Sequence, residues 1–159
     1  MSLRYPEQRN FSCFFVTTTF SRWRKFGNIK AVYEKLADSL VFCCNKYQAN
    51  ISGYVFMPSH LHLLLFIEGS DLGNFMRDFK KYIAQKAFRD LDIVSKDIWN
   101  EGYDRIGVVS RKVFITKLEY IHNNPVKSGL VRSHEEWRWS SAVDYYTKNA
   151  GVIKVYKDW

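Results

Sequence analysis

The chain of 159 residues is 47% hydrophobic and holds 24 Lys and Arg against 16 Asp and Glu, which gives a net charge of +8. That length suits one domain over residues 1–159, and three cysteines without CxxC spacing argue against a disulfide framework or a cysteine zinc site. The basic balance fits either DNA as a polyanionic partner or an ordinary basic surface. The lack of a signal peptide or of an apolar run long enough to span a membrane predicts a cytoplasmic protein.

The sequence predicts strands and helices from residue 11 to about residue 123. Apolar residues at period two or at helical spacing, with breakers between them, define these elements. In chain order we expect strand 11–20, helix 30–47, strands 51–56 and 60–67, a helix from residue 72, strand 103–109, and a helix from about 111 to 123, capped by Ser110 and stopped by Pro125. This order predicts an α+β fold, a ferredoxin-like or RRM-like split βαβ antiparallel sheet with an added C-terminal helix.

Two histidines stand at the start of the strand expected over residues 60–67. Side chains alternate along a strand, so His60 and His62 point to the same face and can chelate one metal ion. They could also be hydrogen-bonded core residues. A shared cation would offset the cost of burying two imidazoles in a strand that is otherwise apolar on both faces.

A second candidate lies on the helix expected before Pro125. Tyr120 and Asn124 are four residues apart and share a helix face, beside an apolar stripe that would dock the helix on the sheet. Lys117, one turn earlier, could favour the phenolate form of Tyr120 or hold a phosphate, or it could be an ordinary solvated lysine. His122 lies on another part of the helix surface, where we expect a structural role.

These segments resemble a known family. Residues 57–64 (MPSHLHLL) are similar to the HUH signature of the single-tyrosine, IS200-like transposases, and residues 120–131 (YIHNNPVKSGLV) resemble their tyrosine-helix signature. Residues 137–141 (WRWSS), Trp99 and residues 103–105 (YDR) fit the branch called REP-associated tyrosine transposases, so the resemblance covers roughly residues 11–146.

The resemblance implies a metal-dependent endonuclease and strand transferase for single-stranded DNA. It makes His60, His62 and Asn124 metal ligands and Tyr120 the nucleophile that forms a 5′-phosphotyrosine. The family's cation is Mg²⁺ or Mn²⁺, although two imidazoles suit zinc or manganese at least as well as magnesium. Hairpin DNA and a homodimer are further implied partners.

Two positions depart from the family pattern. Ser59 stands where Asn usually precedes the first histidine, and residues 9–12 (RNFS) replace the glycine-rich start found in part of the REP-associated branch. The second departure weakens the expectation of REP hairpins as the target.

Basic residues provide candidate contacts to the DNA backbone or to a hairpin stem. They lie in the loop after the first strand, on the polar face of the helix from residue 72, and beside the tyrosine: Arg22, Arg24, Lys25, Arg77, Lys80, Lys81 and Lys117.

Two other functions are possible on the sequence alone. One is a non-catalytic RRM-like protein that stacks bases on Phe11 and Phe15, and the other is a hydrolase with a histidine-activated water.

Overall fold

The computed structural model describes residues 6–89 and 97–158. Its strands and helices follow one another as β1 (Cys13–Thr19), α1 (Val32–Tyr47), β2 (Asn50–Phe56), β3 (His60–Phe66), α2 (Leu72–Lys86), β4 (Asp104–Gly107), α3 (Arg111–Lys127) and α4 (Ala142–Tyr146). Short 3₁₀ turns occupy Pro6–Asn10, Ser21–Trp23, Phe26–Asn28 and His134–Glu136. Every expected strand and helix in the described residues is present, with ends shifted by a few residues.

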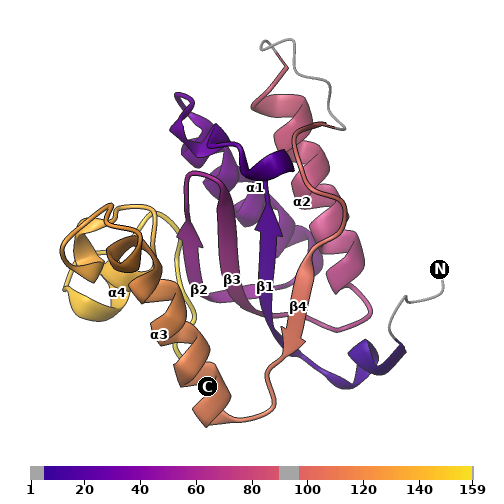
Figure 1. Ribbon diagram of the computed structural model, residues 1–159. Helices are drawn as coiled ribbons and strands as arrows, with labels where there is room; N and C mark the ends of the chain where they lie inside the picture. Colours follow the sequence, from indigo (N-terminus) through magenta and orange to yellow (C-terminus); the bar gives the residue numbers. More distant parts are fainter. Residues whose placement is uncertain (1–5, 90–96, 159) are drawn as a thin grey trace.

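The four strands form one antiparallel sheet in the order β2-β3-β1-β4 (Figure 1). This is the split βαβ arrangement, so the predicted ferredoxin-like α+β fold is confirmed. The strands β1 and β3 are central, as the split βαβ arrangement requires, and their register pairs Thr17 with His62 and Thr19 with His60. The two histidines therefore lie inside the sheet, on its second strand from the β2 edge.

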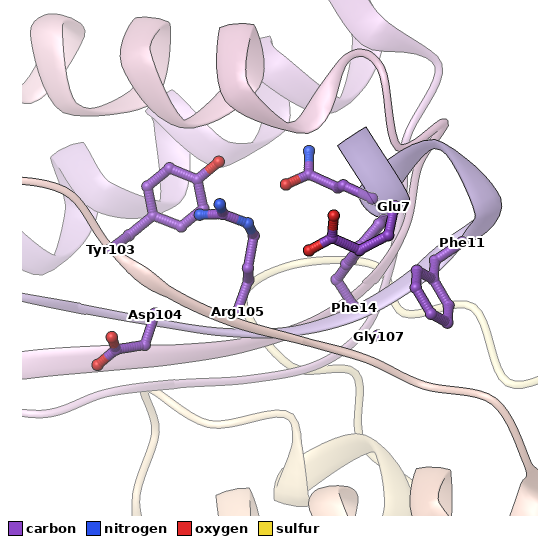
Figure 2. A pocket seen from close by; sticks show the side chains of 8 residues that line it. Glu7, Phe11, Phe14, Tyr103, Asp104, Arg105 and Gly107 are labelled. Atoms are coloured by element: carbon purple, nitrogen blue, oxygen red, sulfur yellow. The ribbon is translucent and has the colours of Figure 1, made fainter. Parts of the chain in front are cut away.

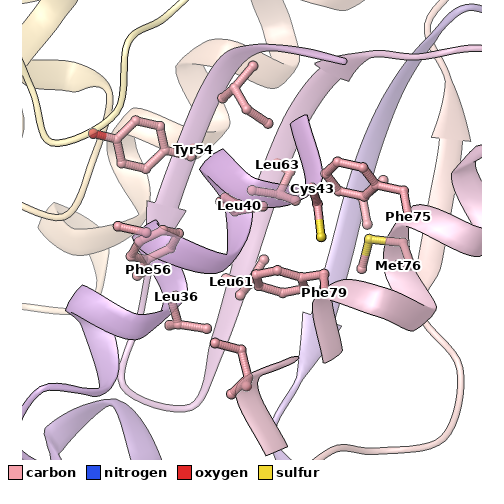
Figure 3. Packing of buried hydrophobic residues seen from close by; sticks show 14 of the residues in the cluster. Leu36, Leu40, Cys43, Tyr54, Phe56, Leu61, Leu63, Phe75, Met76 and Phe79 are labelled. Atoms are coloured by element: carbon pink, nitrogen blue, oxygen red, sulfur yellow. The ribbon is translucent and has the colours of Figure 1, made fainter. Parts of the chain in front are cut away.

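One face of the sheet carries the main apolar core, under α1 and α2. Leu61 and Leu63 of β3 point into it and are fully buried, together with Leu36 and Leu40 of α1 and Phe79 of α2 (Figure 3). The two helices pack against each other above these side chains. Because residues alternate along β3, this core leaves His60 and His62 on the opposite face.

That opposite face is covered by α3. Phe114 and Ile121 of α3 are buried in a second cluster with Phe15 of β1 and Leu64 of β3. Ser110 is the N-cap of α3, because its hydroxyl accepts a hydrogen bond from the backbone N–H of Val113 at 3.2 Å. This docking brings the helix with the candidate nucleophile onto the sheet face that carries the histidines.

The expected end of α3 was wrong, because the helix runs through Pro125 to Lys127. Proline lacks the backbone N–H that would donate to the carbonyl four residues earlier, so the helix forgoes one hydrogen bond in its last turn. The helix stops at Gly129, whose φ of 72° is left-handed, and the backbone N–H of Leu130 returns to the carbonyl of Pro125. Asn124 consequently stays on the helix, on the same face as Tyr120.

The segment after α3 covers the outer edge of β2. Trp139 and Ser141 form backbone hydrogen bonds with Phe56 and Tyr54, and the N–H of Tyr156 donates to the carbonyl of Ile51 at 2.7 Å. This C-terminal segment is therefore packed onto the body of the protein. Among the described residues, no helix combines the length and apolarity required to cross a bilayer.

Candidate functional site

The two imidazoles of β3 lie edge to face, with ring centroids 4.9 Å apart. On each ring a hydroxyl is hydrogen-bonded to Nδ1: Thr17 Oγ1 lies 2.8 Å from Nδ1 of His62, and Ser59 Oγ lies 3.1 Å from Nδ1 of His60. When Nδ1 carries the proton and donates it to the hydroxyl, the lone pair of Nε2 is left for a ligand. Both hydroxyls can thus accept a hydrogen bond from the tautomer that a metal ligand needs.

Burial lowers the pKa of both rings and so favours their uncharged form. The pKa of His62 is lowered to about 3, first by desolvation and then by the neighbouring His60 and the positive charge of Lys117. The pKa of His60 is also lowered by burial, and a hydrogen bond with the side chain of Asn124 opposes this shift. Neutral imidazole is the form that binds cations, so the electrostatics of the pair suit a metal site.

A divalent cation fits the residues present. Nε2 of His62 is buried and has no hydrogen-bond partner in the described structure, which is costly for a buried polar atom unless a ligand completes it. Asn124 adds an amide group beside His60. The described residues contain no cluster of three His, Cys, Asp or Glu side chains that could hold a metal, so the donors here are two imidazoles and one amide.

Tyr120 lies against the same histidine pair. Its ring centroid is 5.2 Å from that of His62 and 5.8 Å from that of Phe15, both edge to face. Tyr120 is 45% exposed, so part of this residue is open to solvent. A tyrosine beside two imidazoles on one sheet face places a potential nucleophile next to potential metal donors.

Phe15 contacts three residues of this site, His62, Tyr120 and Lys117. It stacks on His62 with centroids 5.4 Å apart, and the ammonium of Lys117 lies 4.8 Å from the centre of its ring. Only 7% of Phe15 is exposed, so its ring is not available for stacking a base. Phe11, just before β1, packs against Phe14, whose side chain lies on the opposite face of the sheet from that of Phe15. The RRM-like alternative therefore loses the aromatic platform that it requires.

His122 anchors the tyrosine helix to the rest of the chain. It is buried, and its Nε2 is hydrogen-bonded to Ser141 Oγ at 2.9 Å. Ser141 in turn hydrogen-bonds to both the N–H and the carbonyl of Tyr54 on β2. The structural role expected for His122 agrees with this position, because the network links α3 to the strand beneath it.

The basic candidates are divided between the two faces of the sheet. Lys117 lies at the histidine pair, and Arg22, Arg24 and Lys25 belong to the loop beside His60. Helix α2 lies on the other face, and with it Arg77, Lys80 and Lys81. The ammonium of Lys80 is satisfied by the carbonyls of Asn100 and Gly102, at 2.9 and 2.6 Å. A role in DNA binding remains a prediction for all seven residues.

Thr17, Ser59 and Phe15 are parts of the site that the sequence did not single out as ligand partners. The alternation along β1 places Phe15 and Thr17 on one face, but only the register of β1 against β3 sets Thr17 opposite His62. That register depends on packing of the whole sheet. A threonine two residues after a phenylalanine carries no signal of its own.

A separate pocket lies at the β4 edge, on the sheet face under α2 (Figure 2). It encloses about 290 Å³, and Glu7 and Arg105 both line it, with Phe14 at its floor. The guanidinium of Arg105 lies 5.1 Å from the centre of the Tyr103 ring. Phe14 alternates with Phe15 along β1, so this pocket and the histidine pair are on opposite faces of the sheet.

Comparisons with known proteins agree on one family. Residues 9–124 match the family model described as "Transposase IS200 like". The chain is 24% identical over 122 residues to the REP-associated tyrosine transposase of Escherichia coli K12, covering 76% of this chain and 70% of that protein.

Two solved structures share the fold. A REP-associated tyrosine transposase bound to a REP hairpin has a TM-score of 0.73 at 20% identity, covering 98% of this chain and 91% of that one. A putative transposase from Deinococcus radiodurans has a TM-score of 0.51 at 19% identity, covering 77% and 94%.

Proposed function

The chain belongs to the IS200-like transposases, enzymes that cleave and rejoin DNA, and on this premise we propose that it cuts single-stranded DNA through Tyr120 and a divalent cation. The observation that carries the proposal is the contact between the Tyr120 ring and His62, whose Nε2 is buried without a partner. Nucleophile and metal donors come from one chain, so we propose that residues 1–159 act as one domain and that one copy holds a complete site.

His60, His62 and Asn124 would hold Mg²⁺ or Mn²⁺. The neutral rings and the two hydroxyls on their Nδ1 atoms support this choice of donors. A cation bound there supplies positive charge to a non-bridging oxygen of the scissile phosphate.

Tyr120 carries out the covalent step. Its hydroxyl oxygen attacks phosphorus, an O–P bond forms, and the bond from phosphorus to the 3′ oxygen breaks. The phenolic proton passes to solvent, and the released 3′ oxygen takes up a proton to give a 3′-OH. The 5′-phosphotyrosine keeps the energy of the phosphodiester, so a new 3′-OH can reverse the reaction and rejoin a strand.

The substrate that fits this site is a single strand, next to a hairpin. A phosphate can reach a flat sheet face beneath α3 only where its strand is unpaired. Lys117 beside the histidines and the net charge of +8 support binding of the backbone. The similar fold of a transposase bound to a REP hairpin supports a hairpin as the flanking element.

The test is covalent capture of labelled DNA. The protein is incubated with a library of single-stranded hairpins and Mn²⁺, and denaturing gels reveal protein-linked strands. The unchanged chain should form an adduct, whereas Tyr120→Phe should form none and still bind the strands. Tyr82→Phe on the opposite sheet face is the matched control and should behave like the unchanged chain.

Two outcomes would contradict the proposal. Nicking by Tyr120→Phe would mean that water, and not the tyrosine, attacks the phosphate. Binding without any adduct, whatever the cation, would favour a non-catalytic nucleic-acid protein.

A further inference from the structure

An exposed tryptophan lies at the entrance of the histidine site. Trp23 is 61% exposed, and its ring centroid is 5.7 Å from that of His60. Tyr120 contacts the pair at His62, so the two aromatic side chains flank the proposed cation site from different elements. An indole that is left in solvent beside a catalytic centre needs an explanation, because burial elsewhere would stabilise it.

The backbone that presents Trp23 is strained. Arg22 and Trp23 have φ values of 55° and 56°, a left-handed conformation that is costly for residues with a Cβ. Neither is glycine or asparagine, the residues that adopt it most readily. Two such residues in succession persist only where surrounding contacts hold them, and strain of this kind is concentrated at functional sites.

Surrounding contacts hold the loop firmly. The N–H of Phe20 donates to the carbonyl of Ser59 at 2.9 Å, and the N–H of Gly27 donates to the carbonyl of Pro58 at 2.9 Å. The backbone N–H of Arg22 donates to Asn100 Oδ1, and the side chain of Arg24 is bound by the carbonyls of Ser21 and Asp97. The loop is thus tied to the residues immediately before His60, and Trp23 is a preorganised surface.

The chemistry around Trp23 suits an unpaired nucleotide. Arg22 and Lys25 are exposed on the same loop and add positive charge for a phosphate backbone. An indole face can stack on any base, whereas a base inside a duplex has both faces covered by its stacked neighbours. Resting on the proposed function, we propose that Trp23 is a stacking platform for a base of the single strand next to the phosphate that is cut.

Two DNA probes distinguish the contribution of base stacking to binding from the contribution of phosphate charge. One is fluorescein-labelled dT12, and the other is a twelve-unit abasic strand with the same phosphates and no bases. Binding is followed by fluorescence anisotropy at one salt concentration, with Mg²⁺ present, in a Tyr120→Phe background that forms no covalent product. The variants are Trp23→Ala, Trp23→Phe and Phe42→Ala. Phe42 is a control because it is an aromatic side chain, 52% exposed, on α1 over the opposite face.

Trp23→Ala should weaken binding of dT12 about fivefold or more and leave the abasic strand unchanged. Trp23→Phe should keep most of the affinity, and Phe42→Ala should change neither probe. Equal affinity of Trp23→Ala and its parent for dT12 would overturn the proposal. An equal loss on both probes would also overturn it, because charge or loop structure would then explain the effect.

These readouts are independent of cleavage. If the unchanged chain forms no adduct on hairpin strands but the loss on dT12 persists, the nuclease proposal fails and the platform stands. If adducts form and Trp23→Ala binds dT12 normally, the platform fails and the nuclease proposal stands.

Discussion

Thr17 and His62 lie directly opposite each other on β1 and β3, with the threonine hydroxyl 2.8 Å from Nδ1 of the imidazole. The hydroxyl therefore restricts the rotation of the ring and can accept a hydrogen bond from a protonated Nδ1, which leaves Nε2 for a ligand. Hydrogen-bond partners of this kind commonly change metal affinity about 10- to 100-fold when removed. Thr17 is thus the residue through which the sheet would control the cation site.

Thr17→Val should weaken Mn²⁺ binding by roughly tenfold or more, since valine keeps the shape of threonine but cannot hydrogen-bond to Nδ1. Isothermal titration of the protein with Mn²⁺ measures the affinity without reference to cleavage. Thr17→Ser retains the hydroxyl and should bind within about threefold of the parent. Unchanged Mn²⁺ affinity in Thr17→Val, with the fold intact, would show that the hydroxyl does not prepare the ligand.

Gly53 of β2 lies beneath Leu118 of α3, where the missing side chain leaves room for the leucine. A Cβ at this position would lie 2.7 Å from Leu118 Cδ1, and a valine would add two further carbons. Gly53→Val should lower the free energy of unfolding by about 1–3 kcal/mol. It should also slow adduct formation about tenfold or more by displacing Tyr120 from His62. Urea denaturation and single-turnover adduct assays measure these two effects.

Leu118→Ala offers a matched test of this crowding. Combined with Gly53→Val it should restore part of the adduct rate, because the smaller side chain makes room for the valine. Leu118→Ala alone should reduce stability through lost packing. Wild-type adduct rates in Gly53→Val would mean that the position of α3 does not depend on this contact.

Lys80 should give the protein a pH-dependent stability at alkaline pH. Burial lowers its pKa from 10.5 to about 8 in the folded state. Between about pH 8 and 10.5 the folded protein has released this proton while the unfolded chain retains it, so stability rises with pH in that window. Below pH 8 both states are protonated and the contribution is constant.

Urea denaturation of the parent and Lys80→Met at several pH values isolates this contribution. The parent should gain stability relative to Lys80→Met as the pH rises from 8 to 10.5, because other titrating groups cancel in the difference. A difference that stays flat across the window would contradict the lowered pKa.

Much of the site followed from local rules of sequence. Period-two alternation placed His60 and His62 on the same face of their strand. Helical spacing placed Tyr120 and Asn124 on the same face of their helix. The β-α-β-β-α-β order then predicted that the histidine strand is central. These inferences held because each rests on periodicity within one element or on a topology with few alternatives.

What sequence did not predict depends on contacts between distant segments. Predicting that Thr17 is the hydrogen-bond partner of His62 requires the register of β1 against β3. Predicting that the Trp23 side chain lies beside His60 requires a left-handed backbone at Arg22 and Trp23, which are residues with no preference for it. The passage of α3 through Pro125 overrides a local rule that usually holds. Lys80 looked like a surface charge because no helical pattern shows that carbonyls from residues 100 and 102 bind it.

The covered edge of β2 has a consequence for handling and engineering the protein. Residues 139–141 and 156 occupy backbone groups that would otherwise invite strand addition by other molecules. A version shortened before residue 139 would expose this edge next to a β-rich, apolar sheet, a combination that promotes aggregation. Tags and fusions are therefore best attached through a flexible linker that leaves these residues in place.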